Sequence, residues 1–114
     1  MRASLGFVSL LAALLVGACY NDEGDYIVAR AKYQCIRISE CDGTTFANFY
    51  DGNMDKCRAD FEDFFTKADD LADVLFDYDP DEAKECIKAA RKNKTTCGAG
   101  ADDEISDACD RVFH

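Results

Sequence analysis

The chain has 114 residues, seven cysteines and no tryptophan, with a formal net charge of −10 at pH 7. All 23 acidic residues and 12 of the 13 basic ones follow Cys19, so the part beginning at that cysteine is close to −11. Such a charge disfavours binding to nucleic acid or anionic lipid headgroups and suits cationic partners, divalent ions or simple solubility. The remaining length, about 96 residues, fits one domain with a modest core.

The amino terminus has the pattern of an export signal. An apolar run from Leu5 to Val16 follows the single basic residue Arg2 and ends in Val16-Gly17-Ala18-Cys19. This run is too short to span a bilayer as a stable helix, and small residues before a cysteine are typical of a bacterial lipoprotein signal. The sequence therefore predicts export and processing at Cys19.

We expect residues 1–18 to be a cleaved signal peptide, Cys19 to carry acyl chains such as palmitate, and residues 19–24 to form a short tether. The protein would then be anchored to a membrane of the cell envelope. The outer membrane is preferred because Tyr20, rather than an aspartate, follows the cysteine. Plain secretion is the alternative, because Val16 and Ala18 also suit an ordinary signal peptidase.

Six cysteines remain once Cys19 is set aside. An even number in an exported chain predicts three disulfides, and sequence alone allows 15 pairings. If consecutive helices run antiparallel, Cys41 could reach Cys57. The spacings contain no closely paired knuckle and His114 is the only histidine, so we expect neither a metal site nor a cofactor. The predicted disulfide cysteines are Cys35, Cys41, Cys57, Cys86, Cys97 and Cys109.

Two helices are expected in the first half of the folded part. Apolar residues recur at steps of three and four from Val28 to Ile38, which predicts a helix over about 25–41. Breakers flank an aromatic segment at 42–53, which we expect to be a loop folded under the helices. A long amphipathic helix follows at 54–75, capped by Asn53. Its predicted apolar stripe contains Met54, Cys57, Phe61, Phe64, Phe65, Ala68, Leu71, Ala72 and Leu75.

Two more helices complete the predicted fold. Asp79-Pro80-Asp81-Glu82 is a start signal, with Asp79 as the cap, Pro80 at the first position and Glu82 closing a capping box, and its helix should run to Asn93. Asp102 or Asp103 should cap a last short helix ending near Val112. No segment alternates with the period of a strand. We therefore predict an all-α, disulfide-stapled bundle of about four helices over residues 25–114.

No catalytic set is recognisable, so we do not expect an enzyme. His114 stands alone at a terminus expected to fray, and paired cysteines supply no thiolate. The carboxylate pairs, such as Asp69-Asp70, are expected on solvated helix faces. Alternating carboxylates at 77–82 resemble the start of a calcium loop, but the positions that need glycine and glutamate hold Glu82 and Lys88, so helix capping is preferred.

The aromatic side chains are expected to fill the core rather than line a ligand pocket. Phe64 and Phe65 are adjacent and cannot both point to one line of contact, so one of them is a candidate to face a partner. The full aromatic set is Phe46, Phe49, Tyr50, Phe61, Phe64, Phe65, Phe76 and Tyr78.

The layout also resembles a known group of proteins. A signal ending in cysteine is followed by Cys41, then Phe46 and Tyr50-Asp51-Gly52, then Cys57 at a helix start, Asp79-Pro80-Asp81 before Cys86, and finally Cys97 and Cys109. In these spacings the chain resembles the small six-cysteine lipoproteins and secreted proteins that occur as many paralogues in myxobacteria and related bacteria. The resemblance implies a six-cysteine helical fold and no particular reaction.

These observations predict a non-catalytic envelope lipoprotein that presents a rigid acidic domain to a protein or surface partner, anchored through a lipid on Cys19. Two alternatives stay open. One is a secreted, disulfide-rich inhibitor or effector, and the other is a carrier of small apolar ligands.

Overall fold

The computed structural model describes residues 19–114, so the predicted signal peptide lies outside the described residues. Within this range the chain is all-α, as predicted, and no helix is both long and apolar enough to cross a bilayer. The elements in chain order are η1 (Cys19–Asn21), α2 (Glu23–Cys41), α3 (Gly43–Tyr50), α4 (Met54–Leu75), α5 (Pro80–Lys92) and α6 (Ala99–Cys109).

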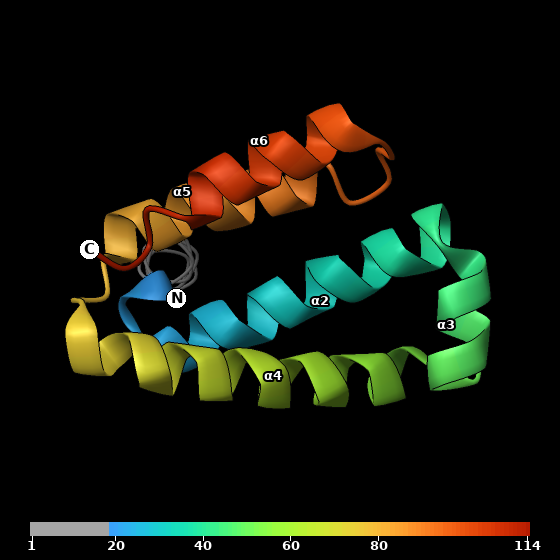
Figure 1. Ribbon diagram of the computed structural model, residues 1–114, viewed down its shortest axis with the longest axis horizontal. Coiled ribbons are helices and arrows are strands. Elements are labelled where there is room, and N and C mark those ends of the chain that lie inside the picture. Colours follow the sequence, from blue (N-terminus) through green and yellow to red (C-terminus); the bar gives the residue numbers. More distant parts are fainter. Residues whose placement is uncertain (1–18) are drawn as a thin grey trace, which may run out of the picture.

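α2 is the central element of the fold. Figure 1 shows α4 along one side of α2, α5 and α6 paired on the other side, and α3 as a short link across one end. The carboxyl terminus returns to the α4–α5 connection, where Asp77 and His114 exchange two backbone hydrogen bonds of 3.1 Å. The main core lies between α2 and α5, with Tyr26, Ile27, Cys86 and Ile87 buried.

The predicted helices at 25–41, 54–75 and 80–93 are confirmed to within two residues, and the start signals of the last two act as expected. Asn53 accepts a hydrogen bond from the Lys56 amide at 3.1 Å, and Asp79 accepts from the amides of Asp81 and Glu82 at 3.0 and 3.2 Å. The predicted capping box is wrong in one respect. The Glu82 side chain pairs with Arg111 instead of returning to its own helix.

The predicted aromatic loop at 42–53 is wrong, because it contains α3. Asp42 is a cap rather than a breaker, since its carboxylate accepts from the Thr45 amide and hydroxyl at 3.3 and 2.6 Å. The helix ends at Asp51 and Gly52, which both have positive φ. Phe49 is 71 % exposed, so this segment does not fold under the other helices.

The last helix also begins earlier than predicted. α6 starts at Ala99 after Gly98, whose φ of 106° suits glycine, and no side chain caps it. Asp102, one of the expected caps, lies inside the helix and forms an ion pair with Arg37. Ile105, Ala108 and Val112, which follow one another at steps of three and four residues, are buried.

Three disulfides pair the six predicted cysteines. Cys35–Cys57 joins α2 to α4, Cys86–Cys109 joins α5 to α6, and Cys41–Cys97 joins the end of α2 to the segment before α6. Cys35, Cys57 and Cys86 have no exposed surface, so two of the three bridges are part of the core.

The expected Cys41–Cys57 pair is wrong because α3 separates the two residues. Its eight residues form a helix about 12 Å long between the end of α2 and the start of α4. Cys57 therefore lies beside Cys35, further back along α2, with a Cα separation of 5.9 Å in the bridge. Cys41, at the tip of α2, is left to reach Cys97.

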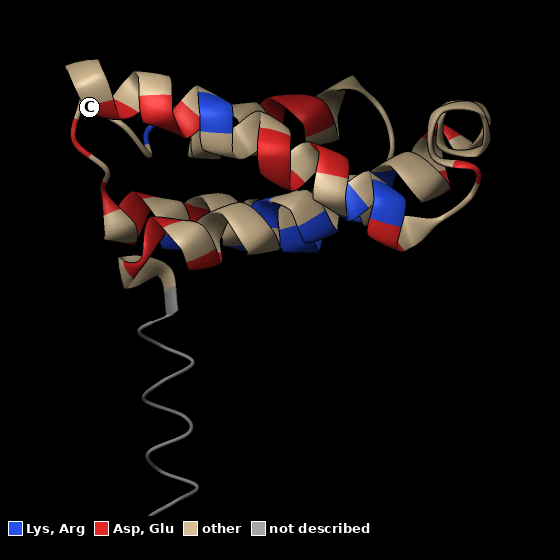
Figure 2. Cartoon of the chain, turned by 90° about the horizontal axis from the view of Figure 1, so that it is seen from below, with Lys and Arg blue, Asp and Glu red and all other residues tan. Residues whose placement is uncertain are grey.

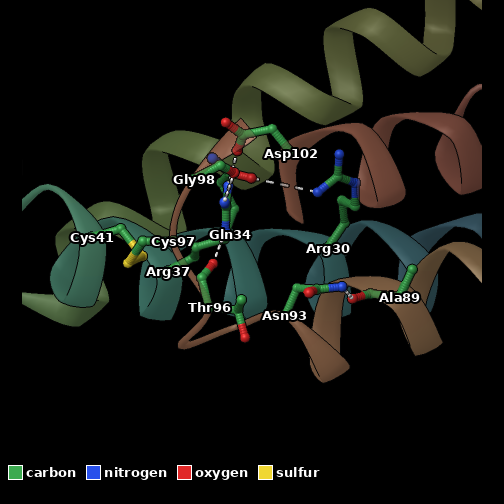
Figure 3. A network of polar contacts seen from close by, with 10 residues as sticks. All are labelled: Arg30, Gln34, Arg37, Cys41, Ala89, Asn93, Thr96, Cys97, Gly98 and Asp102. Carbon is green, nitrogen blue, oxygen red and sulfur yellow. Dashed lines mark hydrogen bonds and ion pairs between the residues drawn. A yellow bond between two sulfur atoms is a disulfide. The ribbon is translucent and has the colours of Figure 1, made fainter. Parts of the chain in front are cut away.

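Arg37 is a structural residue that sequence reasoning missed. Figure 3 shows its side chain reaching from α2 to the α5–α6 connection, beside the Cys41–Cys97 bridge. Its guanidinium donates to the carbonyl oxygens of Thr96 at 3.0 Å and Gly98 at 3.4 Å, and it pairs with the Asp102 carboxylate. Only 14 % of the side chain is exposed, so this ion pair is well shielded from solvent on the arginine side.

We expect Arg37→Ala to lower the free energy of unfolding by about 2 kcal/mol, because two carbonyls and one carboxylate lose their donor together. Denaturant unfolding at pH 7 with intact disulfides measures this loss. Arg91→Ala, at an exposed position on α5, is the matched control and should stay within about 0.5 kcal/mol. Equal losses in the two variants would contradict the role given to Arg37.

The seam between α2 and α4 follows a different line from the predicted apolar stripe. Cys57 is buried, Phe61 and Phe65 are partly buried, and Asp69 is 8 % exposed, so the seam advances by four residues at each step. A row of i to i+4 positions is inclined to the helix axis, and two helices that pack along such rows cross at an angle. The carboxyl-terminal half of the predicted stripe therefore leaves the seam.

Candidate functional site

The predicted anchor residue Cys19 begins η1, and its side chain lies outside what the structure describes. The next residue packs into the fold, because Tyr20 lies against the core and its carbonyl accepts a hydrogen bond of 2.5 Å from the Tyr78 hydroxyl. α2 starts at Glu23. The segment expected to be a free tether at 19–24 is thus docked on the domain, and an anchor at Cys19 would hold the domain close to its attachment point.

Two of the residues weighed for catalysis or calcium binding, His114 and Asp79, contact each other. His114 is not alone, because its Nε2 lies 2.7 Å from the Asp79 carboxylate. That contact, with the capping bonds, holds the pKa of Asp79 below its usual range. Among residues 19–114 no group of three His, Cys, Asp or Glu side chains is arranged to hold a metal ion.

Two of the aromatic side chains border a shallow depression on the surface of the described domain. The depression bordered by Phe49 and Tyr50, with a volume of about 500 Å³, also has Lys56, Asp60 and Asp63 in its lining. Phe49, Phe64 and Phe76 are mainly exposed, so the prediction that the aromatic set fills the core is wrong for these three.

The most unusual surface of the described domain is the side of α4 turned away from the seam. We call it the outer face of α4 and define it by Phe64, Leu71, Val74 and Leu75, which are 59, 71, 77 and 72 % exposed. Within residues 19–114, α4 contacts only α2 and α3, and Figure 1 shows it as the outermost helix. Large apolar side chains gathered in this way are uncommon on the surface of a monomeric domain.

The Phe64–Phe65 pair divides as the sequence predicted. Phe65 packs against the core and lies under the Arg30 guanidinium, whose carbon is 5.2 Å from the ring centre. Phe64 points outward and meets Phe65 edge to face at 5.4 Å between ring centres. Phe64 thus packs against a partly buried neighbour, and its exposed surface forms one end of the outer face.

A carboxylate cluster lies next to the outer face, where the start of α2 meets the end of α4. We call it the acidic corner and define it by Glu23, Asp69, Asp70 and Asp73. Glu23 and Asp73 are in hydrogen-bonding contact through their carboxyl groups. Asp69 is 8 % exposed, and its buried Oδ2 atom has no hydrogen-bond partner.

Two carboxyl groups of the acidic corner, those of Glu23 and Asp69, have raised pKa values. Burial and the neighbouring carboxylates, Asp73 above all, raise the pKa of Glu23 to about 7. Burial, then Asp73 and Asp70, raise the pKa of Asp69 to about 6, against a lowering by Arg30. The nearby Tyr78 hydroxyl also has a raised pKa, mainly because of its burial. The corner therefore holds protons at pH values where ordinary carboxylates have lost them.

The prediction that Asp69-Asp70 lies on a solvated face is wrong for Asp69 and right for Asp70, which is exposed. A signal for the buried position was present in the sequence. Phe61, Phe65 and Asp69 form a row of four-residue steps that starts at Cys57, and only the angle between α2 and α4 decides that this row is the seam.

Comparison of the chain with protein-family models, curated proteins and solved structures finds no match in any of the three.

Proposed function

We propose that this protein is a non-catalytic lipoprotein of the bacterial cell envelope whose helical domain binds another protein through the outer face of α4. The observation that carries the proposal is the exposure of four large apolar side chains on one helix of a domain with a small core. A buried position for these residues would stabilise a monomer, so their exposure favours a surface kept for a partner.

The leader supports the anchoring half of the proposal. An apolar run ending at Val16-Gly17-Ala18-Cys19 is the pattern a lipoprotein peptidase processes, and three disulfides suit an oxidising compartment. We keep the resemblance to the six-cysteine proteins of myxobacteria as part of this proposal.

Mass spectrometry of the unreduced protein from a Gram-negative host should find acyl chains on Cys19. An unmodified Cys19 would favour the secreted alternative.

Site-directed photo-crosslinking in cells that naturally make the protein tests the binding half. Benzoylphenylalanine placed at Leu71 or Leu75 should form an adduct with one envelope protein, whereas the same group at Lys84, exposed on α5, should not. The adduct should disappear when Val74→Asp is added, because a charge in the face opposes burial. Adducts of the chain with itself, or no adduct at all from either position, would overturn the proposed binding surface.

A further inference from the structure

Among residues 19–114, no ion pair involves a carboxylate of the acidic corner. The last turn of α4 contains no basic residue, although a helix carboxyl terminus favours cations. Asp69 and Asp73 are four residues apart on one helix, which places like charges side by side. Arg30 lowers the pKa of Asp69 without restoring it to its usual value.

Carboxylates also lie along the border of the outer face. Asp63 and Asp70 directly precede Phe64 and Leu71 at a spacing of seven residues, so they form a row beside the face. Lys67 neutralises Asp63 through an ion pair of 2.8 Å, whereas Asp70 adds its charge to the acidic corner. In Figure 2 red segments alternate with tan ones in the carboxyl-terminal part of α4, beyond a blue segment near the middle of the helix.

The buried carboxylate of Asp69 is a further observation in this region. An unpartnered carboxylate oxygen in a nearly buried side chain is costly, and such an exception calls for a specific explanation. Asp70 and Asp73 lie on the solvent side of Asp69, as their exposure shows. A cation held by these two residues would offset the negative field that acts on the buried carboxylate.

The apolar spacing indicates the shape of the partner. Phe64, Leu71 and Leu75 lie on one line of α4, at positions i, i+7 and i+11, and this line is about 16 Å long. An amphipathic helix of three or four turns covers such a line with its own seam of apolar residues.

Resting on the proposed function, we propose that the element bound by the outer face is an amphipathic helix with an apolar seam and flanking Lys or Arg residues, whose cations bind at the acidic corner. A second copy of the chain fits less well. Its basic helix, α5, has its apolar residues Ala83, Cys86 and Ile87 buried in its own core, so it offers cations without a seam.

Two designed helical peptides of 18 residues test this inference. Both carry the same leucine seam, one with Lys at the flanking positions and the other with Glu. Each is titrated into the full chain carrying Cys19→Ser, which removes the acyl acceptor, and binding is followed by fluorescence anisotropy at pH 8. We expect the Lys peptide to bind at least about tenfold more tightly than the Glu peptide, with an affinity that falls as salt is raised.

Three paired variants separate the possible results. Asp70→Asn with Asp73→Asn should weaken the Lys peptide about tenfold, whereas Asp103→Asn with Asp107→Asn, the same charge change at exposed positions of α6, should have little effect. Leu71→Ser with Leu75→Ser should abolish binding. If the Asp70 and Asp73 change has no effect while the leucine change does, the cationic inference fails and the proposed surface stands. If the leucine change has no effect, or neither peptide binds, the surface itself fails.

Proton release gives a second readout that a purely apolar contact would not produce. A cation at the acidic corner lowers the pKa of Glu23 and Asp69, so binding near pH 6.5 should expel protons. Calorimetry in phosphate and in Bis-Tris, which both buffer near this pH and differ in ionisation enthalpy, measures their number. Equal heats in the two buffers would overturn the assignment of these carboxylates as the cation site, and self-association of the chain in sedimentation would overturn the choice of a foreign helix.

Discussion

Replacing Cys35 and Cys57 together by alanine should lower the free energy of unfolding by about 4 kcal/mol. The bridge closes a loop with a sequence separation of 22, for which the chain-entropy argument gives about 3 kcal/mol. Both cysteines are fully buried, so their removal also leaves space in the core and adds to the loss. For a small domain this is most of the stability available.

We expect the loss of the Cys35–Cys57 bridge to destabilise α4 before the other helices. Within the described residues this helix contacts only α2 and α3. The carboxyl-terminal part of its seam with α2 contains the charged Asp69 rather than an apolar side chain. Thermal unfolding measures the overall loss, and amide hydrogen exchange locates it, with protection lost in α4 before α5 and α6. Cys41→Ala with Cys97→Ala is the comparison variant and should leave α4 protected. A midpoint within about 5 °C of the parent, or equal loss in all helices, would contradict this prediction.

Stability should fall as the pH rises from about 5 to 8, the opposite of ordinary acid denaturation. The folded pKa of Asp69 is about 6 against 3.8 for the free group, and that of Glu23 is about 7 against 4.5. Because the folded state binds these protons more tightly, their contribution is complete below the unfolded values and is lost as the pH passes through the folded ones. Asp79 and Glu104 have lowered pKa values and act in the other direction, at acid pH.

Asp69→Asn tests the origin of this pH dependence. It keeps the shape of the side chain and removes the charge, so it should stabilise the protein by about 2 kcal/mol at pH 8 and by almost nothing at pH 4. Denaturant unfolding at the two pH values measures both differences. Asp107→Asn, at an exposed position on α6, is the control and should change stability by less than about 0.5 kcal/mol at either pH. A parent protein as stable at pH 8 as at pH 5, with no gain from Asp69→Asn, would show that the corner is already neutralised.

Local sequence determined most of the secondary structure, because the signals for it act over a few residues. At the helix starts the side chains of Asn53 and Asp79 accept hydrogen bonds from free amides, and Pro80 has no amide hydrogen that would need a partner. These effects do not depend on the rest of the chain. The buried stripe of α5, from Ala83 to Ala90, also follows from the spacing of its apolar residues alone. This helix packs between α2 and α6, so its apolar side is covered. α3 was missed because a cap such as Asp42 and a turn residue have the same composition.

Tertiary structure decided which cysteines pair and which side chains form the candidate site. The angle between α2 and α4 places Asp69 in the seam and leaves Leu71 and Leu75 outside it, although period alone predicts the reverse. The same geometry brings Glu23 to Asp73, 50 residues away in the chain. The spacing of apolar residues predicts that a helix has an apolar side, but only the positions of the neighbouring helices determine how much of that side is buried.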